Sequence, residues 1–198
     1  MPDFFEVVGA QRACRAFTAD QVPDADVERI LSSATSAPSA ENRQPWIFVV
    51  VRDDDGRRRI GELTRRAWED FASEHSARRL EPKMFEEVDR AMGGGIAEAP
   101  VLVVVAGDTT AVARAALGPS IWPAVQNLLL AANALGYGSA LTTLTTAFAD
   151  ELRAIVGLPD HMRPMAVVPL GHPARLPGRP RRQPVATKTH REQYGTAW

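Results

Sequence analysis

Residues 101–106 constrain the fold more than any other part of this chain. They read Val-Leu-Val-Val-Val-Ala, without a polar side chain, and Pro100 precedes them. A strand with one face in water alternates apolar and polar residues, whereas an unbroken apolar run of this kind is typical of a strand buried on both faces. The sequence therefore predicts a fully buried strand here, within a sizeable core.

The remaining apolar pattern predicts helices and strands in mixed order. Helices are expected at 4–11, from Asp24 to a point before Pro38, through most of 56–92 with a break near Pro82, at 121–135 and at 149–156. Further strands are expected at 46–51, as a short strand or strand end at 138–143, and at 165–170. Asp24 is a candidate N-cap and Gly136 a candidate C′ residue. Because strands and helices do not alternate strictly, the α+β class is favoured over a doubly wound parallel sheet.

Length and charge narrow the class of protein. The chain has 198 residues, which suits one domain, and its net charge of −1 gives no reason to expect nucleic acid or an anionic membrane as a partner. Its single cysteine excludes an intrachain disulfide framework and a multi-cysteine zinc site. There is no visible secretory signal and no apolar run of the ~20 residues that a membrane helix needs, so a cytoplasmic protein is expected.

Familiar catalytic and phosphate-binding motifs are missing from the sequence. It contains no G-x-x-x-x-G-K-[ST] loop, and the stretch 136–141 lacks the third glycine of a dinucleotide fingerprint and follows a predicted helix. Ser139 is not in a G-x-S-x-G elbow. The four histidines have no ligand partner at helical spacing, so a metal site has weak support. Cys14 is a candidate nucleophile, although a lone cysteine is most often a small buried hydrophobe.

A polar loop between a helix and a strand is the first candidate for function. Residues 37–46 read Ala-Pro-Ser-Ala-Glu-Asn-Arg-Gln-Pro-Trp, so Ser39, Asn42, Arg43 and Gln44 stand between two prolines. Loops held by a rigid scaffold carry binding and catalytic residues disproportionately often. We therefore interpret this loop as a candidate binding element.

Two pairs of arginines are candidates for anion binding. Arg12 and Arg15 follow the first predicted helix, and Arg181 and Arg182 lie in the proline-rich tail. Both pairs could be solvated surface charges, and the tail could be a non-specific nucleic-acid arm. The guanidinium fork, however, matches phosphate geometry bidentately. The tail also ends in aromatic residues, which are costly to leave exposed, so it is expected to dock on another surface.

Threonines cluster after the glycine-rich stretch 136–141. They are Thr142, Thr143, Thr145 and Thr146. Threonine is common in strands for packing reasons alone. Alternatively, hydroxyl and N–H groups at the end of a strand could donate hydrogen bonds to a bound ligand.

These segments occur in the order expected for one protein family. The motif R-x-x-R-x-F at 12–17 precedes A-P-S-A-x-N-x-Q-P-W at 37–46, A-P-V-L-x-V-V at 99–105, L-G-Y-G-S at 135–139, L-G-H-P at 170–173 and a terminal R-R-x-P at 181–184. Over most of its length, the chain resembles the FMN-dependent nitroreductase family. The loop at 37–46 is the most specific of these motifs.

The resemblance implies an architecture. It implies an α+β fold in which a central mixed, mainly antiparallel sheet is flanked by helices. It also implies a single FMN-binding domain over 1–198, an intertwined homodimer with two FMN sites at its interface, and a C-terminal arm, at about 175–198, that packs on the partner subunit.

Residue by residue, the resemblance assigns FMN contacts to four parts of the chain. They are Arg12, Ala13, Cys14 and Arg15 in the first motif; Pro38, Ser39 and Asn42 in the loop, part of which would come from the partner subunit; Leu141, Thr142 and Thr143 near the ring nitrogen N5; and Arg181 and Arg182 near the phosphate. The family often has arginine at the position of Gln11 and serine at that of Ala13. One charge and one hydroxyl are therefore lost, and Arg181 is a candidate to compensate.

The implied activity is that of an FMN-dependent oxidoreductase. NAD(P)H would deliver hydride to the flavin, and a small-molecule acceptor such as a nitroaromatic or a quinone would then be reduced on the same open face, in ping-pong order. Arg15, beside N1 and O2, would stabilise the reduced flavin. No catalytic side chain is expected, because the flavin carries out the chemical step.

Three other functions stay open. Other members of the family dehalogenate iodotyrosines, fragment flavin or oxidise small heterocycles, and the variable segment 68–92 would decide between these reactions. The loss of polar groups at Gln11 and Ala13 is compatible with a protein that binds FMN without turnover. A nucleic-acid-binding protein that uses the basic tail is disfavoured by the near-neutral charge.

Overall fold

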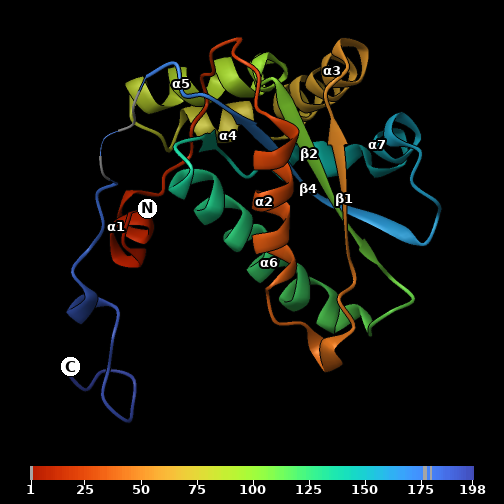
Figure 1. Cartoon of the computed structure of the whole chain (residues 1–198). Coiled ribbons are helices and arrows are strands. Elements are labelled where there is room, and N and C mark those ends of the chain that lie inside the picture. Colours follow the sequence, from red (N-terminus) through yellow and green to blue (C-terminus); the bar gives the residue numbers. More distant parts are fainter. Residues whose placement is uncertain (1, 176–177, 179) are drawn as a thin grey trace.

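A computed structural model of the protein describes residues 2–175, 178 and 180–198 (Figure 1). Its helices are α1 (Phe4–Ala10), α2 (Asp24–Thr35), α3 (Asp54–Phe71), α4 (Ser73–Ala77), α5 (Pro82–Met92), α6 (Arg114–Ala134) and α7 (Ala149–Val156). Its strands are β1 (Trp46–Val51), β2 (Val101–Asp108), β3 (Gly138–Ser139) and β4 (Met162–Gly171). Short 3₁₀ helices are η1 (Ala40–Asn42), η2 (Gly95–Glu98), η3 (Leu144–Phe148) and η4 (Val185–Thr187). This mixture is the α+β class that the sequence predicts.

The strands form an antiparallel sheet in the order β1-β2-β4-β3. β2 is an inner strand, so that Val104 pairs with Val49 of β1 on one side and with Val167 of β4 on the other. Every residue from Val101 to Ala106 is 0% exposed. The prediction of a strand buried on both faces is confirmed.

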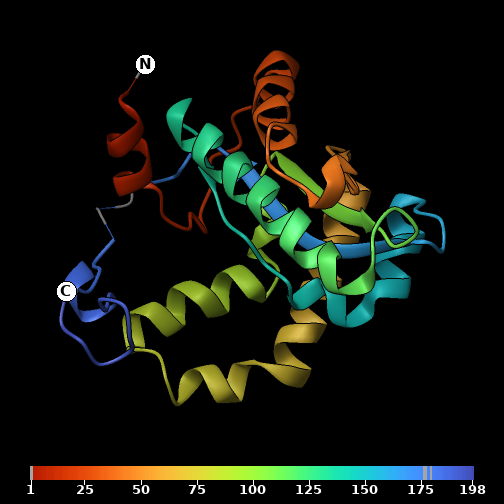
Figure 2. The same ribbon diagram turned by 90° about the horizontal axis from the view of Figure 1, so that it is seen from below.

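Helices cover both faces of the sheet and divide the core into two layers. Val101, Val103 and Val105 pack with α2 and α6, whereas the alternate residues Leu102 and Val104 pack with α3, α5 and α7. Figure 2 shows α2 toward the top and α4 and α5 toward the bottom, with the sheet between them. The apolar run of β2 thus reflects a helical layer on each face.

Several predicted boundaries shift in the structure. Pro23 occupies the N-cap of α2, and Asp24 is its first helical residue, where a carboxylate still interacts favourably with the helix dipole. The long helical segment divides into α3, α4 and α5. β4 begins at Met162 rather than at 165, because it continues to pair with β2 past a register shift between Val105 and Ala106. β3 is shorter than the predicted strand region.

α6 begins at Arg114 rather than at 121, although it contains Pro119 and Pro123. Proline lacks the N–H that a helix interior uses, which favours a later start on local grounds. The early turns form because Leu117 and Ile121 are buried in the core and because the hydroxyl of Ser120 donates to the Ala116 carbonyl at 2.8 Å. Even so, no helix in the described part of the chain is both long and apolar enough to cross a bilayer.

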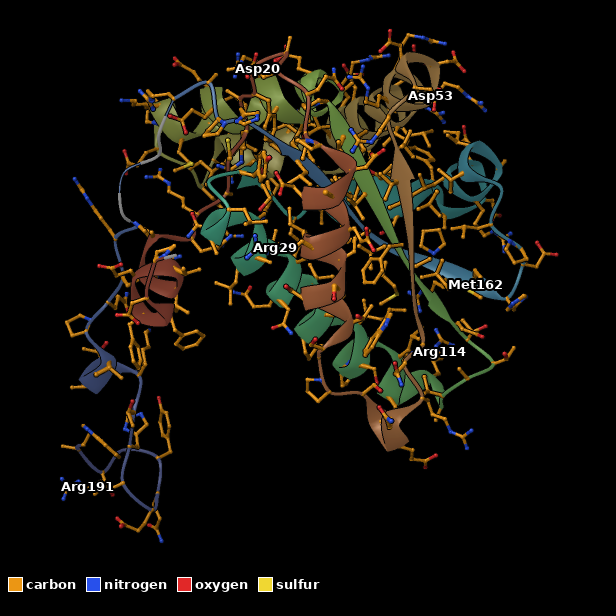
Figure 3. The ribbon with its side chains drawn as sticks, in the orientation of Figure 1. Asp20, Arg29, Asp53, Arg114, Met162 and Arg191 are labelled. Carbon is orange, nitrogen blue, oxygen red and sulfur yellow. The ribbon has the colours of Figure 1, made fainter. Side chains whose placement is uncertain are left out.

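The described part of the C-terminal arm (residues 175, 178 and 180–198) leaves large apolar side chains in water. Val185, Tyr194 and Trp198 are 71%, 94% and 64% exposed. Arg191 marks the far end of the arm, away from the sheet (Figure 3). In this conformation the ring contacts of the arm are internal, since Tyr194 packs edge-on against His190 at 4.6 Å between ring centroids.

A hydrogen bond between side chains ties the turn before β3 to α2. Tyr137 is 8% exposed, and its hydroxyl donates to Oδ2 of Asp26 at 2.5 Å. Burial, together with the Asp26 carboxylate, raises the pKa of Tyr137 to about 12. Gly136, which precedes it, has a φ of 85°, a conformation that glycine adopts without strain. These contacts determine where β3 begins.

We expect Tyr137 to ionise only in strongly alkaline solution. The chain has two tyrosines, so the tyrosinate absorbance of a Tyr194→Phe variant reports Tyr137 alone. Because the folded-state pKa lies above the ~10 of an unfolded tyrosine, the stabilisation is complete below about pH 10 and is lost as the pH rises through about 12. In that background, Asp26→Asn should bring ionisation to lower pH. An identical titration curve would remove Asp26 as a cause.

Candidate functional site

Backbone hydrogen bonds fix the first arginine motif to the edge of the sheet. Ala13 pairs with Ser139 of β3 in a parallel bridge, and the N–H of Cys14 donates to the Ser139 carbonyl at 2.8 Å. Further along, Phe17 pairs with Pro173, just beyond β4. The segment 12–17 therefore continues the sheet beyond β3.

Gly138 permits this close approach, and Cys14 fills the space beside it. A Cβ atom at Gly138 would lie 2.6 Å from Sγ and 2.7 Å from Cβ of Cys14. Cys14 is 5% exposed, and its thiol donates to the Ala16 carbonyl at 3.3 Å. Burial raises the pKa of the Cys14 thiol, so it stays neutral near pH 7 and is unsuited to nucleophilic attack.

Two adjoining cavities lie where the segment 12–17 meets α5 and the C-terminal arm. The larger, of about 670 Å³, is lined mainly by residues 11–13 and 15, by Lys83, Met84 and Glu87 of α5, and by Arg175, Arg181 and Arg182. The smaller, of about 380 Å³, is lined by residues 12–16, by Glu86, Glu87 and Arg90 of α5, and by Arg175 and Gly178. Both volumes are typical of small-molecule sites.

The structure brings two distant parts of the predicted site together. Arg12, Ala13 and Arg15 share the wall of the larger cavity with Arg181 and Arg182, although more than half of the chain separates them in sequence. The smaller cavity adds Cys14 to this group. Arg12 also donates to the Gly178 carbonyl at 3.3 Å, which links the motif directly to the arm.

Positive charge exceeds negative charge around the two cavities. Their walls contain the basic residues Arg12, Arg15, Lys83, Arg90, Arg175, Arg181 and Arg182, and the acidic residues Glu81, Glu86 and Glu87. Among the described residues, Arg175 is the one cation of this set with a carboxylate oxygen within 4.0 Å, that of Glu87 at 3.5 Å. Unpaired guanidinium groups around a hollow form a site suited to an anion.

The arginines of α3 show the opposite arrangement. Each has an acidic partner: Arg57 with Asp54, Arg58 and Arg59 with Asp55, Arg65 with Glu69, and Arg66 with Glu151. This surface neutralises itself and is a solvated face of the molecule. In the part of the chain that the structure describes, most cations around the cavities therefore differ from those of α3 in lacking an acidic partner.

Arg15 is partly withdrawn from water against α5. Its Nη1 lies 3.9 Å from Sδ of Met84. Burial lowers the pKa of Arg15, and the nearby Glu87 carboxylate opposes the shift. The guanidinium stays charged at neutral pH, because arginine does not lose its proton in proteins. A partly desolvated charge attracts an anion more strongly than one in bulk water does.

The loop at 37–46 has an unusual backbone. Glu41, Asn42 and Gln44 have φ angles of 51°, 54° and 49°, a region in which residues other than glycine are uncommon. Ser39 Oγ accepts a hydrogen bond from the Gln44 N–H at 2.9 Å. Such conformations persist where the surrounding structure holds them, and they cluster at functional sites.

Within one chain, this loop lies away from the cavities. Ser120, near the start of α6, accepts a hydrogen bond from the Ala40 N–H at 3.1 Å. Asn133, near the end of the same helix, donates to the Val7 carbonyl of α1. These two positions are about 20 Å apart along the helix axis, and Figure 1 shows α1 and the loop after α2 at opposite ends of α6. Pro38, Ser39 and Asn42 therefore do not join the arginines in one chain.

The three residues after β3 differ in exposure. Leu141 is 44% exposed and Thr143 is also exposed. Thr142 is 6% exposed, its Oγ1 lies 3.7 Å from Sδ of Met92, and its N–H donates to the Val167 carbonyl at 3.0 Å. The Thr142 hydroxyl is thus turned into the core, whereas Leu141 and Thr143 are open to a ligand.

The cavities also contain residues to which sequence reasoning assigns no role. They include Lys83, Met84, Glu86, Glu87 and Arg90 of α5, together with Glu81 and Arg175. Helical periodicity places Met84 and Glu87 on one face of α5. It does not reveal which surface that face meets. In the described part of the chain, no cluster of three or more His, Cys, Asp or Glu residues could hold a metal ion.

Residues 8–172 match the family model described as "Nitroreductase family". This chain belongs to the nitroreductase family. The resemblance seen in the order of the sequence motifs is confirmed, and the antiparallel sheet flanked by helices is the fold that it implies.

Relatives of this nitroreductase-family chain carry two kinds of name. It is 28% identical over 183 residues to a protein of Methanothermobacter thermautotrophicus that is named, provisionally, NADH dehydrogenase/NAD(P)H nitroreductase; the match covers 89% of this chain and 80% of the relative. It is also 28% identical over 173 residues to the iodotyrosine deiodinase of Thermotoga neapolitana, with 87% and 90% covered.

Solved structures in the family superimpose on this one. An oxidised iodotyrosine deiodinase bound to FMN and 3-iodo-L-tyrosine is 26% identical, with a TM-score of 0.75 over 91% of this chain and 95% of that chain. A provisionally named nitroreductase of Desulfovibrio desulfuricans in complex with FMN is 26% identical, with a TM-score of 0.75 over 98% and 99%.

We expect Gly138→Ala to destabilise the protein and to displace the segment 12–17. The new methyl group would overlap Cys14, whose backbone is tied to Ser139. Overpacking of this kind costs about 1–3 kcal/mol of unfolding free energy, which urea titration measures. Gly9→Ala is the control, because a Cβ there meets nothing within 4 Å. Equal stability of the two variants would contradict the packing argument.

Proposed function

We propose that this protein is an FMN-dependent oxidoreductase whose cofactor phosphate binds among Arg12, Arg181 and Arg182, with Arg15 on the pyrimidine side of the flavin. The observation that carries the proposal is the set of guanidinium groups without acidic partners around the cavity of about 670 Å³. A phosphate dianion needs two or three such donors, and arginine binds it bidentately. Membership of the nitroreductase family, with FMN-bound relatives, supports the same cofactor.

The residues present fit this cofactor in charge and in reach. Arg12 and Arg15 come from the sheet edge, and Arg181 and Arg182 from the arm, so that cations surround the cavity from two sides. Gln11 and Ala13 provide no cation and no hydroxyl here, and Arg181 supplies a positive charge that the first motif lacks. The size of the cavity also favours a cofactor, because a sulfate or another small anion would need less space. Family relatives with bound FMN strengthen the assignment.

The chain would position the cofactor rather than react with the substrate. Arg15, held against α5, would place its charge beside N1 and O2 of the ring, where preorganised positive charge favours reduction. Leu141 and Thr143, exposed after β3, would lie along the ring. Bound FMN would accept two electrons from NAD(P)H and pass them to a small-molecule acceptor, such as a nitroaromatic or a quinone, in ping-pong order.

We further propose a homodimer in which each subunit completes the site of the other. The loop with Pro38, Ser39 and Asn42 contacts α6 at Ser120, whereas Arg12 lies near Asn133, about 20 Å further along the helix axis. A second copy is therefore needed to bring the loop to a flavin. The exposed aromatic side chains of the C-terminal arm would pack on the partner subunit. Size-exclusion chromatography with light scattering should give a dimer. A monomer that retains tight FMN binding would refute this arrangement.

Reductive dehalogenation is a second candidate, on the same flavin. It is favoured by the similarity to the deiodinase of Thermotoga neapolitana over 90% of that protein and by the fit to a deiodinase bound to 3-iodo-L-tyrosine. Release of iodide from 3-iodo-L-tyrosine by the reduced protein would favour this chemistry. Turnover of nitroaromatics or quinones without iodide release would favour the reduction of such acceptors as the function.

The visible absorption spectrum of the purified protein tests the central proposal. A yellow protein that bleaches with NADH or NADPH in the absence of oxygen holds a reducible flavin. A yellow protein that does not bleach favours a different electron donor or a binding role without turnover. A colourless protein that takes up no added FMN would refute the proposed cofactor.

We expect Arg182→Ala to weaken FMN binding about tenfold or more and to leave the fold intact. Loss of a charge-assisted hydrogen bond is worth about 1.5–3 kcal/mol, and Arg182 is exposed in the arm. Flavin fluorescence quenching measures the affinity, and circular dichroism checks the fold. Arg78→Ala is the matched control, since Arg78 is an exposed arginine that pairs with Glu74 on α4. Equal FMN affinity in the two variants would count against the phosphate assignment.

A further inference from the structure

Glu87 is the carboxylate common to the two cavities. In the described part of the chain, Glu81 lines the larger cavity and Glu86 the smaller, whereas Glu87 lines both, together with Arg15 and Arg175. Its side chain is 35% exposed, and its Oε1 lies 3.5 Å from Nη2 of Arg175. An acidic group thus lies among the three cations that both cavities share, Arg12, Arg15 and Arg175, in a site that otherwise suits an anion.

The face of α5 that carries Glu87 also holds Arg15 in place. Met84 and Glu87 are one turn apart on the helix, and Met84 Sδ contacts Nη1 of Arg15 at 3.9 Å. Glu87 attracts Arg15 electrostatically, while Arg12 repels it and the Cys14 thiol contributes weakly. Glu87 is therefore the acidic side chain whose charge Arg15 senses.

The position of α5 is fixed from its other side. Trp68 of α3 is 4% exposed, and its Nε1 donates to Oδ1 of Asp89 at 2.7 Å. The Trp68 ring also packs against Phe85, with 6.2 Å between centroids. Since Asp89 is two residues from Glu87, this anchor holds the Glu87 carboxylate toward the cavities.

We propose that Glu87 is a positioning residue that acts through Arg15 and Arg175 and limits the positive charge that the site offers to a phosphorylated flavin. This inference rests on the proposed function. Compared with a site that has the same arginines but no carboxylate at this position, Glu87 weakens cofactor binding and makes the bound flavin harder to reduce. Neither effect requires Glu87 to touch the substrate.

The sign of both effects follows from electrostatics. FMN carries a phosphate dianion, and a neighbouring carboxylate repels it. Reduction adds negative charge near N1 and O2, so a carboxylate beside Arg15 opposes reduction, whereas a neutral side chain does not. Because the site is partly desolvated, a single charge at this range changes an equilibrium constant by roughly tenfold.

The test compares Glu87→Gln with Glu28→Gln, a control that removes the same charge from an exposed position on α2 and lines neither cavity. FMN affinity is measured by fluorescence quenching, and the midpoint potential by anaerobic reduction with a reference dye. Glu87→Gln should bind FMN several-fold more tightly. It should also favour the reduced over the oxidised flavin about tenfold more than the wild type does. For a two-electron couple, this corresponds to a midpoint potential about 30 mV higher.

A further variant separates charge from shape. Glu87→Asp keeps the carboxylate and should retain affinity and potential near those of the wild type, whereas a role in packing alone would leave the nearly isosteric Glu87→Gln at wild-type values and change Glu87→Asp. Glu28→Gln should change both quantities by less than about twofold, because charge effects of exposed, distant groups are screened. If Glu87→Gln binds and reduces FMN as the wild type does, or if Glu28→Gln has the same effect as Glu87→Gln, the inference is wrong. A wild-type protein that binds no flavin would instead refute the proposed function.

Discussion

The double burial of β2 is the constraint on which the rest of the structure depends. Because Val101, Val103 and Val105 face one way and Leu102 and Val104 the other, the sheet must have a helical layer on each side. α2 and α6 supply one layer, and α3, α5 and α7 the other. This arrangement places the end of α6, β3 and α5 around the segment 12–17, where the two cavities form. The core therefore determines the position of the candidate site without contributing its chemistry.

The site itself depends on a close backbone approach at the sheet edge. The N–H of Cys14 donates to the Ser139 carbonyl, and Gly138 leaves room for the Cys14 side chain. A buried, neutral thiol fits there because it is small and apolar, which is a structural role and not a nucleophilic one. The strand pairing thus orients the flanking Arg12 and Arg15 toward α5 and the arm, and the tail arginines reach the same cavity.

Charge pairing distinguishes this site from the surface of α3. The arginines of α3 have acidic partners, whereas most cations around the cavities have none within the described chain. Leaving several like charges close together is unfavourable, and a bound anion removes that penalty. Glu87 moderates the same field from α5. A protein that needed only to bind a phosphate would gain from losing this carboxylate, so its presence is understandable if the site also controls the energy of an electron carrier.

Local patterns in the sequence determined most of the secondary-structure elements and the protein family. Only the tertiary structure decided which of these elements contact one another. The apolar run of β2, the period of α2 and the glycines after α6 predict their elements because these preferences act over a few residues. The start of α6 at Arg114 could not be predicted, since burial of Leu117 and Ile121 outweighs the local effect of Pro119. Arg12, Arg15, Arg181 and Arg182 were recognisable as candidates from residue type and motif order. Their convergence, the distance of the loop residue Asn42 from them, and the place of Glu87 between Arg15 and Arg175 depend on long-range packing, which no local pattern encodes.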